Sequence, residues 1–225
     1  MSEFNKFANT YDELLNKSLK ISGENHEYYS EKRICHFITY ASNKENFKLN
    51  SVLDFGCGIG NFYSSVLSNI PNIDYLGVDV SKDSITIAKN KFKSNRFKQL
   101  NEYEPNNNFS SIYSNGVFHH IKPNLRKEAL NYIFNSLKIT GFFSFWENNP
   151  FNLGTRYIMS QNPFDRDAQL ISPSKARGLL KQVGFNIVST NYYFYFPRCL
   201  NLLRRFEFML KKIPLGAQYN IIATK

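Results

Sequence analysis

The chain has 225 residues, a formal net charge of +10 at pH 7 and 42% hydrophobic residues. This length suits one α/β domain with a sizeable core, and the hydrophobic content argues against extended disorder. No stretch approaches the roughly 18 apolar residues that span a bilayer, and no signal-peptide pattern opens the chain, so we expect a cytoplasmic protein. Cys35, Cys57 and Cys199 lack paired spacing, which favours reduced thiols over a disulfide framework or a zinc site.

The N-terminal part of the sequence predicts two helices. Apolar residues from Phe4 to Leu15 recur at helical spacing, which indicates an amphipathic helix. A break at Ser22 and Gly23 follows, and a second helical stretch runs from about residue 27 to residue 40. A polar connector then leads into a different pattern.

From residue 50 the sequence alternates between short apolar strands and amphipathic helices. Seven segments have the character of strands, namely residues 51–55, 73–80, 97–100, 110–114, 141–147, 185–196 and 218–224. Repeated strand–helix units predict an α/β fold with a Rossmann-like, doubly wound, mostly parallel seven-stranded sheet and helices on both faces. The last two strands have no α/β unit between them, so we expect an antiparallel strand at one edge.

Several helices between these strands have recognisable ends. Ser81 is expected to cap the helix after the second strand. Pro123 introduces the most strongly periodic helix, which we expect to stop near Gly141. Ser172, followed by a proline, begins a last helix that ends at Gly184.

A glycine-rich loop follows the first strand, where α/β sheets bind their ligands. It has the pattern Asp54-x-Gly56-x-Gly58-x-Gly60, in which the third glycine comes one residue too early for the dinucleotide-binding pattern. The glycines permit positive φ angles and a close approach of a ligand, and Cys57 between them is small. The carboxylate of Asp54 would repel a pyrophosphate but suits an ammonium group, such as that of S-adenosylmethionine.

A second acidic residue ends the second strand. Asp79, followed by Val80, comes about 20 residues after the loop, the separation at which a carboxylate accepts hydrogen bonds from both ribose hydroxyls of a bound nucleoside. An N-cap or turn role would explain Asp79 alone. The loop and Asp79 together predict a cofactor site for a sulfonium nucleoside.

These motifs resemble the class I S-adenosylmethionine-dependent methyltransferase family from about residue 4 to the end of the chain. Its cofactor loop is similar to residues 52–60, its ribose acid to Asp79, and its fourth-strand motif, which includes Asn115, to residues 114–120. The resemblance implies S-adenosylmethionine as the cofactor. It also implies an N-terminal helical lid, residues 1–45, over a methyltransferase domain of residues 46–225.

Two further segments, residues 146–152 and 196–219, resemble a bacterial subgroup that methylates small molecules. That subgroup has a histidine where this chain has Asn148. In the family the N-terminal helices cover the cofactor and the acceptor, so Tyr11, Tyr28 and Tyr29 are expected either to line the lid or to pack in the core.

Three residues could carry the chemistry of methyl transfer. An oxygen nucleophile needs a base, and His119 and His120 follow the fourth strand, beside the glycine loop. Either histidine could face the methyl group, or both could only close the loop. Glu147 ends the fifth strand, where it could orient a histidine, accept an acceptor hydroxyl or cap a turn. Asn148 and Asn149 could add neutral hydrogen bonds, and no metal is expected.

The segment of residues 199–216 carries an apolar stripe surrounded by basic residues. The first interpretation is a core-packed helix with a solvated basic face. The second is a surface that meets anionic lipid or a lipid-linked substrate.

The leading functional prediction is methylation of a small-molecule acceptor, at a hydroxyl of a sugar, lipid-linked or secondary-metabolite substrate. The positive charge leaves a nucleic-acid methyltransferase as an alternative, although the sequence has no dedicated nucleic-acid module. A non-catalytic relative that only binds the cofactor is the third hypothesis.

Overall fold

The computed structural model describes residues 10–225. The first part of the predicted N-terminal helix lies outside the described residues, and helix α1 (Tyr11–Leu19) contains the described part of it. A 3₁₀ turn then ends at Gly23, which has a positive φ of 76°, at the predicted break. Helix α2 (His26–Asn43) follows, and the side chain of Asn25 caps it by accepting a hydrogen bond from the Tyr28 N–H. The second predicted helix is therefore confirmed.

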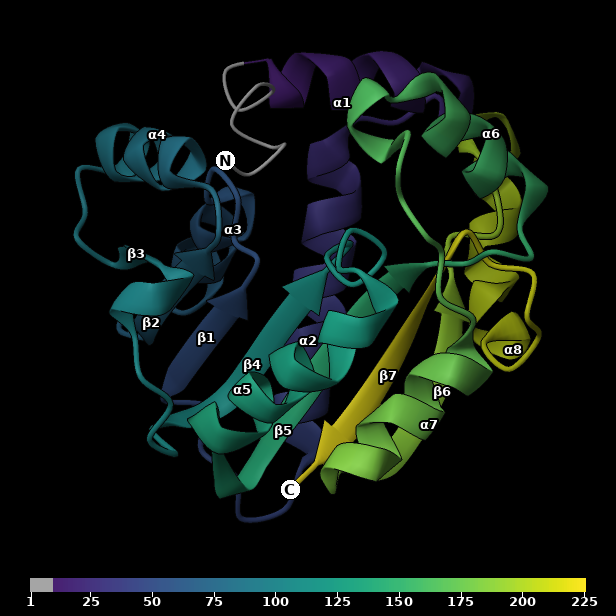
Figure 1. Ribbon diagram of the computed structural model, residues 1–225. Coiled ribbons are helices and arrows are strands. Elements are labelled where there is room, and N and C mark those ends of the chain that lie inside the picture. The colour runs from purple at the N-terminus through teal and green to yellow at the C-terminus, as the bar shows by residue number, and fades with distance from the viewer. Residues whose placement is uncertain (1–9) are drawn as a thin grey trace.

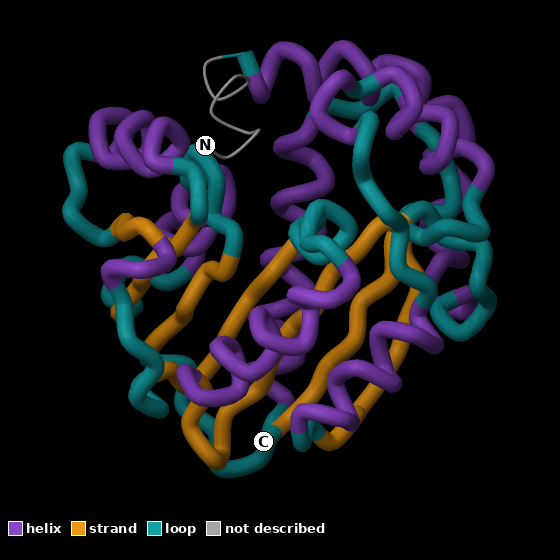
Figure 2. Tube along the Cα trace, viewed as in Figure 1, coloured by secondary structure: helices purple, strands orange, loops and turns teal. Residues whose placement is uncertain are grey.

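A seven-stranded sheet in the order β3-β2-β1-β4-β5-β7-β6 forms the centre of the described part of the chain (Figure 1, Figure 2). All neighbouring pairs are parallel except those of β7, which is antiparallel to both β5 and β6. The fold class is confirmed, with β7 lying just inside the edge strand β6. The strands are β1 (Ser51–Phe55), β2 (Asp74–Asp79), β3 (Phe97–Gln99), β4 (Phe109–Asn115), β5 (Leu137–Asn148), β6 (Asn186–Tyr193) and β7 (Gln218–Thr224).

Helices cover both faces of this sheet, and each face has its own apolar core. On one face α2 packs with α3 (Asn61–Asn69) and α4 (Lys82–Phe92), and on the other face α5 (Arg126–Ser136) packs with α7 (Pro173–Val183). In β1, Val52 joins the first core while Leu53 joins the second, because successive side chains of a strand point to opposite faces. Both faces are buried, as expected for a doubly wound sheet.

Local signals set the ends of several helices. The Ser81 hydroxyl accepts a hydrogen bond from the Ser84 N–H and caps α4, and the Ser172 hydroxyl caps α7 in the same way. Gly184 ends α7 with a φ of 112°. These three predictions are confirmed.

The predicted end of the helix near Gly141 is wrong. Helix α5 ends at Ser136, and the next residue, Leu137, already belongs to β5 and pairs with Phe109. Leu137 is fully buried, so packing favours the extended chain there. Gly141 lies within β5, where a Cβ atom would come 2.8 Å from the Ser110 carbonyl oxygen. The glycine therefore permits close strand contact and does not end a helix.

Two short elements, helix α6 (Leu153–Gln161) and the 3₁₀ helix η5 (Pro163–Asp165), are absent from the sequence-based prediction. The Asn152 side chain caps α6 by accepting a hydrogen bond from the Thr155 N–H, and this pattern was the available signal. Helix α6 contacts α1 beyond the carboxyl ends of the parallel strands (Figure 1). The extent of the predicted lid, residues 1–45, stays a prediction.

The segment before β7 forms the 3₁₀ helix η6 (Arg198–Phe206) and the single turn α8 (Glu207–Leu210). It is not a core-packed helix, because Leu200 has non-helical angles and neither element contains a buried residue. The apolar side chains of this stripe are instead partly exposed. Contact with anionic lipid stays a prediction. No helix of the described residues is long and apolar enough to cross a membrane.

Candidate active site

A cavity of about 660 Å³ opens at the carboxyl ends of β1, β2 and β4. Strand β1 lies between β2 and β4, so the strand order reverses at β1. Such a switch point is where α/β sheets bind ligands. Five of the predicted cofactor residues line the cavity, namely Gly56, Gly58, Asp79, Val80 and Asn115.

The glycine loop passes close to the loop that follows β4. Gly56 has a φ of 76°, and a Cβ atom there would lie 2.3 Å from the Val117 Cγ2 atom. The N–H groups of Gly56 and Cys57 both donate to the Val78 carbonyl oxygen, at 2.8 and 3.0 Å. A Cβ atom at Gly58 would meet nothing within 4 Å, so the backbone is open to the cavity there. Close packing behind Gly56 and free space at Gly58 leave room for a bulky ligand.

Asp79 joins the glycine loop to the end of β2. Its Oδ2 atom accepts a hydrogen bond from the Gly58 N–H at 2.9 Å, and its Oδ1 atom accepts one from the Ser81 N–H at 2.8 Å. Burial raises the pKa of Asp79 and outweighs the opposing effect of these backbone donors. The carboxylate therefore positions the loop as well as facing the cavity.

Three predicted cofactor residues do not line the cavity. Asp54 is 3% exposed, and its Oδ2 atom accepts a hydrogen bond from the Tyr75 hydroxyl at 2.6 Å. Cys57 packs against Gly77, where a Cβ atom would lie 2.9 Å from its sulfur. At Gly60 a Cβ atom would lie 2.7 Å from a Phe92 ring carbon. All three face the protein interior and not the cavity, because they pack against residues of the core.

Burial of Asp54 predicts an unusual dependence of stability on pH. Desolvation raises the pKa of Asp54 to about 7, above its usual value, although the Tyr75 hydrogen bond acts in the opposite direction. The folded state therefore binds one more proton than the unfolded state between about pH 4 and 7, so stability falls as pH rises through this window. Asp54→Asn removes the cost of burying the charge at high pH.

We expect Asp54→Asn to raise the free energy of unfolding of the cofactor-free chain by about 2 kcal/mol more at pH 8 than at pH 5. Urea unfolding at both values measures the gain. Asp74→Asn, at an exposed carboxylate on β2, is the matched control and should change neither value. An equal effect of Asp54→Asn at both pH values would contradict the raised pKa.

His119 is held inside the protein by Glu147. His119 is 3% exposed, and its Nδ1 atom lies 2.6 Å from the Glu147 Oε2 atom. Glu147 is fully buried, and its Oε1 atom accepts a hydrogen bond from the Phe118 N–H at 2.7 Å. Burial lowers the pKa of His119, but the carboxylates of Glu147 and Asp165 outweigh it and raise the pKa to about 10. His119 does not line the cavity, whereas its neighbour His120 does.

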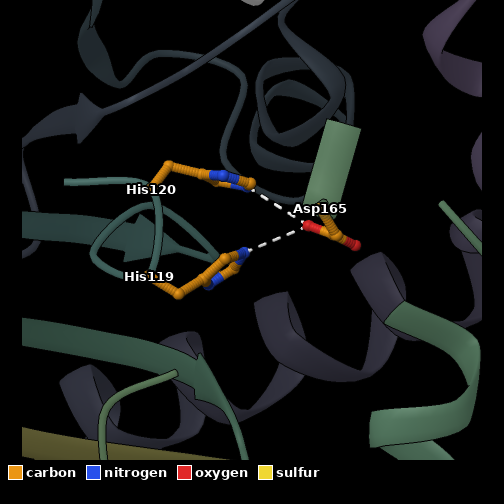
Figure 3. Close-up of side chains that lie close together, drawn as sticks. All are labelled: His119, His120 and Asp165. Atoms are coloured by element: carbon orange, nitrogen blue, oxygen red, sulfur yellow. Dashed lines mark ion pairs between the residues drawn. The ribbon is translucent and has the colours of Figure 1, made fainter. Parts of the chain in front are cut away.

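Asp165, which the sequence did not indicate, contacts both histidines (Figure 3). Its Oδ1 atom lies 3.3 Å from the His120 Nε2 atom and 3.5 Å from the His119 Nε2 atom. Its Oδ2 atom accepts a hydrogen bond from the Asn162 amide at 3.1 Å. Burial raises the pKa of Asp165, but the two imidazoles outweigh it and lower the pKa to about 2. The ligand atoms of His119, His120 and Asp165 lie within 4.8 Å of one another, so a metal ion could be held here.

Arg126 ties together the two loops that carry this cluster. Its Nε atom donates to the Ile121 carbonyl oxygen at 2.9 Å, and its Nη2 atom donates to the Gln169 carbonyl oxygen at 2.6 Å. The Gln169 N–H in turn donates to the His119 carbonyl oxygen at 2.7 Å. The backbone around the cluster is thus fixed by hydrogen bonds from a buried arginine and from the chain itself.

The predicted acceptor residues lie elsewhere. The Asn149 amide donates to the carbonyl oxygens of Pro214 and Gly216, so it fixes the chain before β7. Asn148 accepts a hydrogen bond from the Gln218 amide at 3.0 Å. Neither asparagine lines the cofactor cavity, because the backbone before β7 satisfies Asn149 and a β7 side chain engages Asn148.

The predicted lid tyrosines are also separate from the cofactor cavity. The rings of Tyr28 and Tyr29 both contact Phe194, with centroids 6.5 and 4.9 Å away. The Arg204 guanidinium stacks over Tyr28, 4.6 Å from its centroid. The side chain of Tyr11 lies outside the described residues. The described pair packs α2 against the segment after β6.

Comparisons with known proteins agree with this architecture. The family model described as a methyltransferase domain matches residues 53–143. A malonyl-[acyl-carrier protein] O-methyltransferase 2 of Ilyobacter polytropus is 28% identical over 100 residues, which are 42% of this chain and 38% of that protein. The match thus spans well under half of the relative's length.

Two solved structures share the fold along most of their length. A methyltransferase from Archaeoglobus fulgidus described as dependent on S-adenosylmethionine superposes with a TM-score of 0.66 at 19% identity, covering 89% of this chain and 95% of that one. A possible histamine N-methyltransferase from Thermotoga maritima gives 0.63 at 17% identity, covering 99% and 98%.

The sheet order, the glycine loop and the cavity at the strand ends define a Rossmann-like class I methyltransferase fold. The family model over residues 53–143 agrees with this fold, and the chain is similar to S-adenosylmethionine-dependent methyltransferases. S-adenosylmethionine is the cofactor of this family.

Proposed function

We propose that this protein transfers the methyl group of S-adenosylmethionine to a hydroxyl oxygen of a small molecule, a class that includes sugars and secondary metabolites. The observation that carries the proposal is the position of His120 in the wall of the same cavity as Gly56, Gly58 and Asp79. One cavity thus brings the predicted cofactor loop together with a side chain that can act on an acceptor.

The cavity fits the cofactor in size and in chemistry. Its volume of about 660 Å³ falls within the usual range for sites of small molecules and cofactors. The backbone at Gly58 is open to the bulk of a nucleoside, and the Asp79 carboxylate can accept hydrogen bonds from ribose hydroxyls. When bound, the cofactor supplies a methyl group on a sulfonium sulfur, and the electron pair of the breaking C–S bond stays on sulfur.

The cluster at His120 binds and activates the acceptor hydroxyl. A hydroxyl oxygen must lose its proton as it forms the bond to the methyl carbon, and enzymes meet this need with a base or with a cation that acidifies the hydroxyl. His120 faces the cavity, while Asp165 and the buried pair of His119 and Glu147 hold the region behind it. Fixed geometry of this kind aligns an acceptor for in-line displacement.

The names of two similar proteins support a small acceptor group, since one is a malonyl-[acyl-carrier protein] O-methyltransferase, whose malonyl group is borne by a carrier protein, and the other a possible histamine N-methyltransferase. The alternatives are RNA methylation and cofactor binding without turnover. Incubation with a radiolabelled methyl donor and either hydroxylated small molecules or total RNA separates them. Label transferred only to RNA, or no turnover with any acceptor, would contradict the proposal.

His120→Ala tests the placement of the acceptor. Because the imidazole lines the cavity wall, we expect turnover to fall by about 10²- to 10⁴-fold, while the affinity for S-adenosylmethionine changes by less than about threefold. Calorimetric titration gives the affinity, and label transfer gives the turnover. Lys181→Ala, on the exposed side of α7, is the control with unchanged activity. Full turnover in His120→Ala would place the acceptor elsewhere.

A further inference from the structure

The cluster of His119, His120 and Asp165 has the spacing of metal ligands. The Asp165 Oδ1 atom lies 3.3 and 3.5 Å from the two Nε2 atoms, both beyond the usual N–H···O separation of about 2.7 to 3.2 Å. Ligand atoms about 2.1 Å from a tetrahedral cation are about 3.4 Å from one another. Figure 3 shows both imidazole rings directed at the same carboxylate oxygen. One cation between the three atoms would therefore satisfy these two distances, and all three ligand atoms lie within 4.8 Å of one another.

Two of the three ligands also have the supporting contacts that metal ligands require. A histidine that binds a metal almost always gives its other ring N–H to a carboxylate, a carbonyl or water. The His119 Nδ1 atom makes this contact with Glu147 at 2.6 Å, which leaves Nε2 directed at Asp165. The Asn162 amide holds the second oxygen of Asp165 at 3.1 Å. Glu147 thus fixes the orientation of His119, and Asn162 fixes that of Asp165.

The charge balance of the cluster favours a cation. The side chains of Glu147 and Asp165 are 0% and 5% exposed. Buried carboxylates require a compensating positive charge. Among the described residues, the ion pairs of these two carboxylates are with His119 and His120, and the Arg126 guanidinium acts on Glu147 only at longer range. A divalent cation would compensate both carboxylates while the histidines remain neutral ligands.

The cluster reaches the cofactor cavity through His120. His119 and Asp165 are almost fully buried, whereas His120 is 16% exposed at its side chain and lines the cofactor cavity. Three protein ligands with a further position open to the substrate are the arrangement of catalytic metal sites. Two imidazoles and one carboxylate suit zinc, manganese or iron better than magnesium or calcium, which prefer oxygen ligands.

We propose that His119 Nε2, His120 Nε2 and Asp165 Oδ1 bind one divalent first-row metal cation of the zinc or manganese type, with an open position facing the cofactor cavity. Its part in catalysis rests on the function proposed above. An acceptor hydroxyl bound at that open position releases its proton to solvent more readily, and its oxygen is held for bond formation with the methyl carbon.

Metal titration of the chelator-treated full chain tests this site directly. We expect calorimetry with Zn²⁺ and with Mn²⁺ to give one site per chain, and Co²⁺ to give visible absorption bands of a cation with nitrogen and oxygen ligands. Asp165→Asn preserves the volume of the side chain and should weaken binding by at least about tenfold. His120→Gln, at the exposed side of the cluster, is the second variant if the first does not fold.

The His26 side chain provides the matched control. Its Nε2 atom lies 3.9 Å from the Asp12 Oδ1 atom, so it is a histidine–carboxylate pair outside the cluster, and His26→Gln should leave metal affinity unchanged. Absence of a stoichiometric site, or equal affinity in both cluster variants, would overturn the proposal. S-adenosylmethionine binding and methyl transfer by the same metal-free chain would then leave the proposed function standing. His120 would in that case act as the general base, with Asp165 as its carboxylate partner.

Discussion

Asp79→Ala is expected to weaken binding of S-adenosylmethionine by about 100-fold or more. The substitution removes the acceptors of the Gly58 and Ser81 N–H groups, and each hydrogen bond to a charged group is worth about 1.5 to 3 kcal/mol. It also removes a carboxylate that lines the cavity, where we propose that it accepts hydrogen bonds from the ribose. The glycine loop then loses its anchor to β2 at the point where the cofactor must approach its backbone.

Calorimetric titration of the folded variant with S-adenosylmethionine measures this loss. Asp83→Ala is the matched control, because Asp83 is an exposed carboxylate in the first turn of α4, four residues further along the chain. The control should bind the cofactor as tightly as the parent chain. Circular dichroism must show that Asp79→Ala keeps its secondary structure. A folded Asp79→Ala variant with unchanged affinity would refute the role of this carboxylate.

Glu147→Ala is expected to lower the free energy of unfolding by about 3 to 5 kcal/mol. The fully buried carboxylate accepts the Phe118 N–H and pairs with His119, and no water can replace it there at low cost. Its removal leaves the buried Phe118 N–H group without its acceptor, and the buried imidazole of His119 keeps only the more distant Asp165 carboxylate. The loss is large because one side chain supports both the loop after β4 and the histidine behind the cavity.

Urea unfolding measures this effect, and two variants sharpen it. Glu147→Gln keeps an acceptor for the Phe118 N–H but loses the ion pair, so its loss should be smaller than that of Glu147→Ala. Glu45→Ala, at an exposed carboxylate, should change stability by less than about 0.5 kcal/mol. If Glu147→Ala were no less stable than Glu45→Ala, the buried pair would be energetically neutral.

Where local chemistry decides the structure, the sequence-based prediction holds. The bounds of β1 agree with the predicted residues 51–55, and Ser81, Ser172 and Gly184 end their helices as expected. Each of these features depends on side chains within a few residues of one another. A cap requires only its own hydroxyl and a neighbouring N–H, so the information lies in the local sequence.

Where packing decides, the prediction fails. Leu137 continues the apolar period of α5, but the pairing of β5 with β4 and the fully buried position of Leu137 make it a strand residue. The apolar stripe between residues 199 and 216 suggested a core helix. The structure gives η6 and α8 without a buried residue, and Leu200 interrupts the helical angles there.

By itself, the sequence determined the fold class, the glycine loop and the acidic residue of β2, because their spacing along the chain fixes their positions at the ends of parallel strands. Only the tertiary structure decided which side chains face the cavity. Asp54 turned out to be buried against Tyr75, and Asp165, 45 residues after His120, came into contact with both histidines. Contact between such distant residues depends on how α6 and η5 pack over the sheet, and no local pattern specifies that packing.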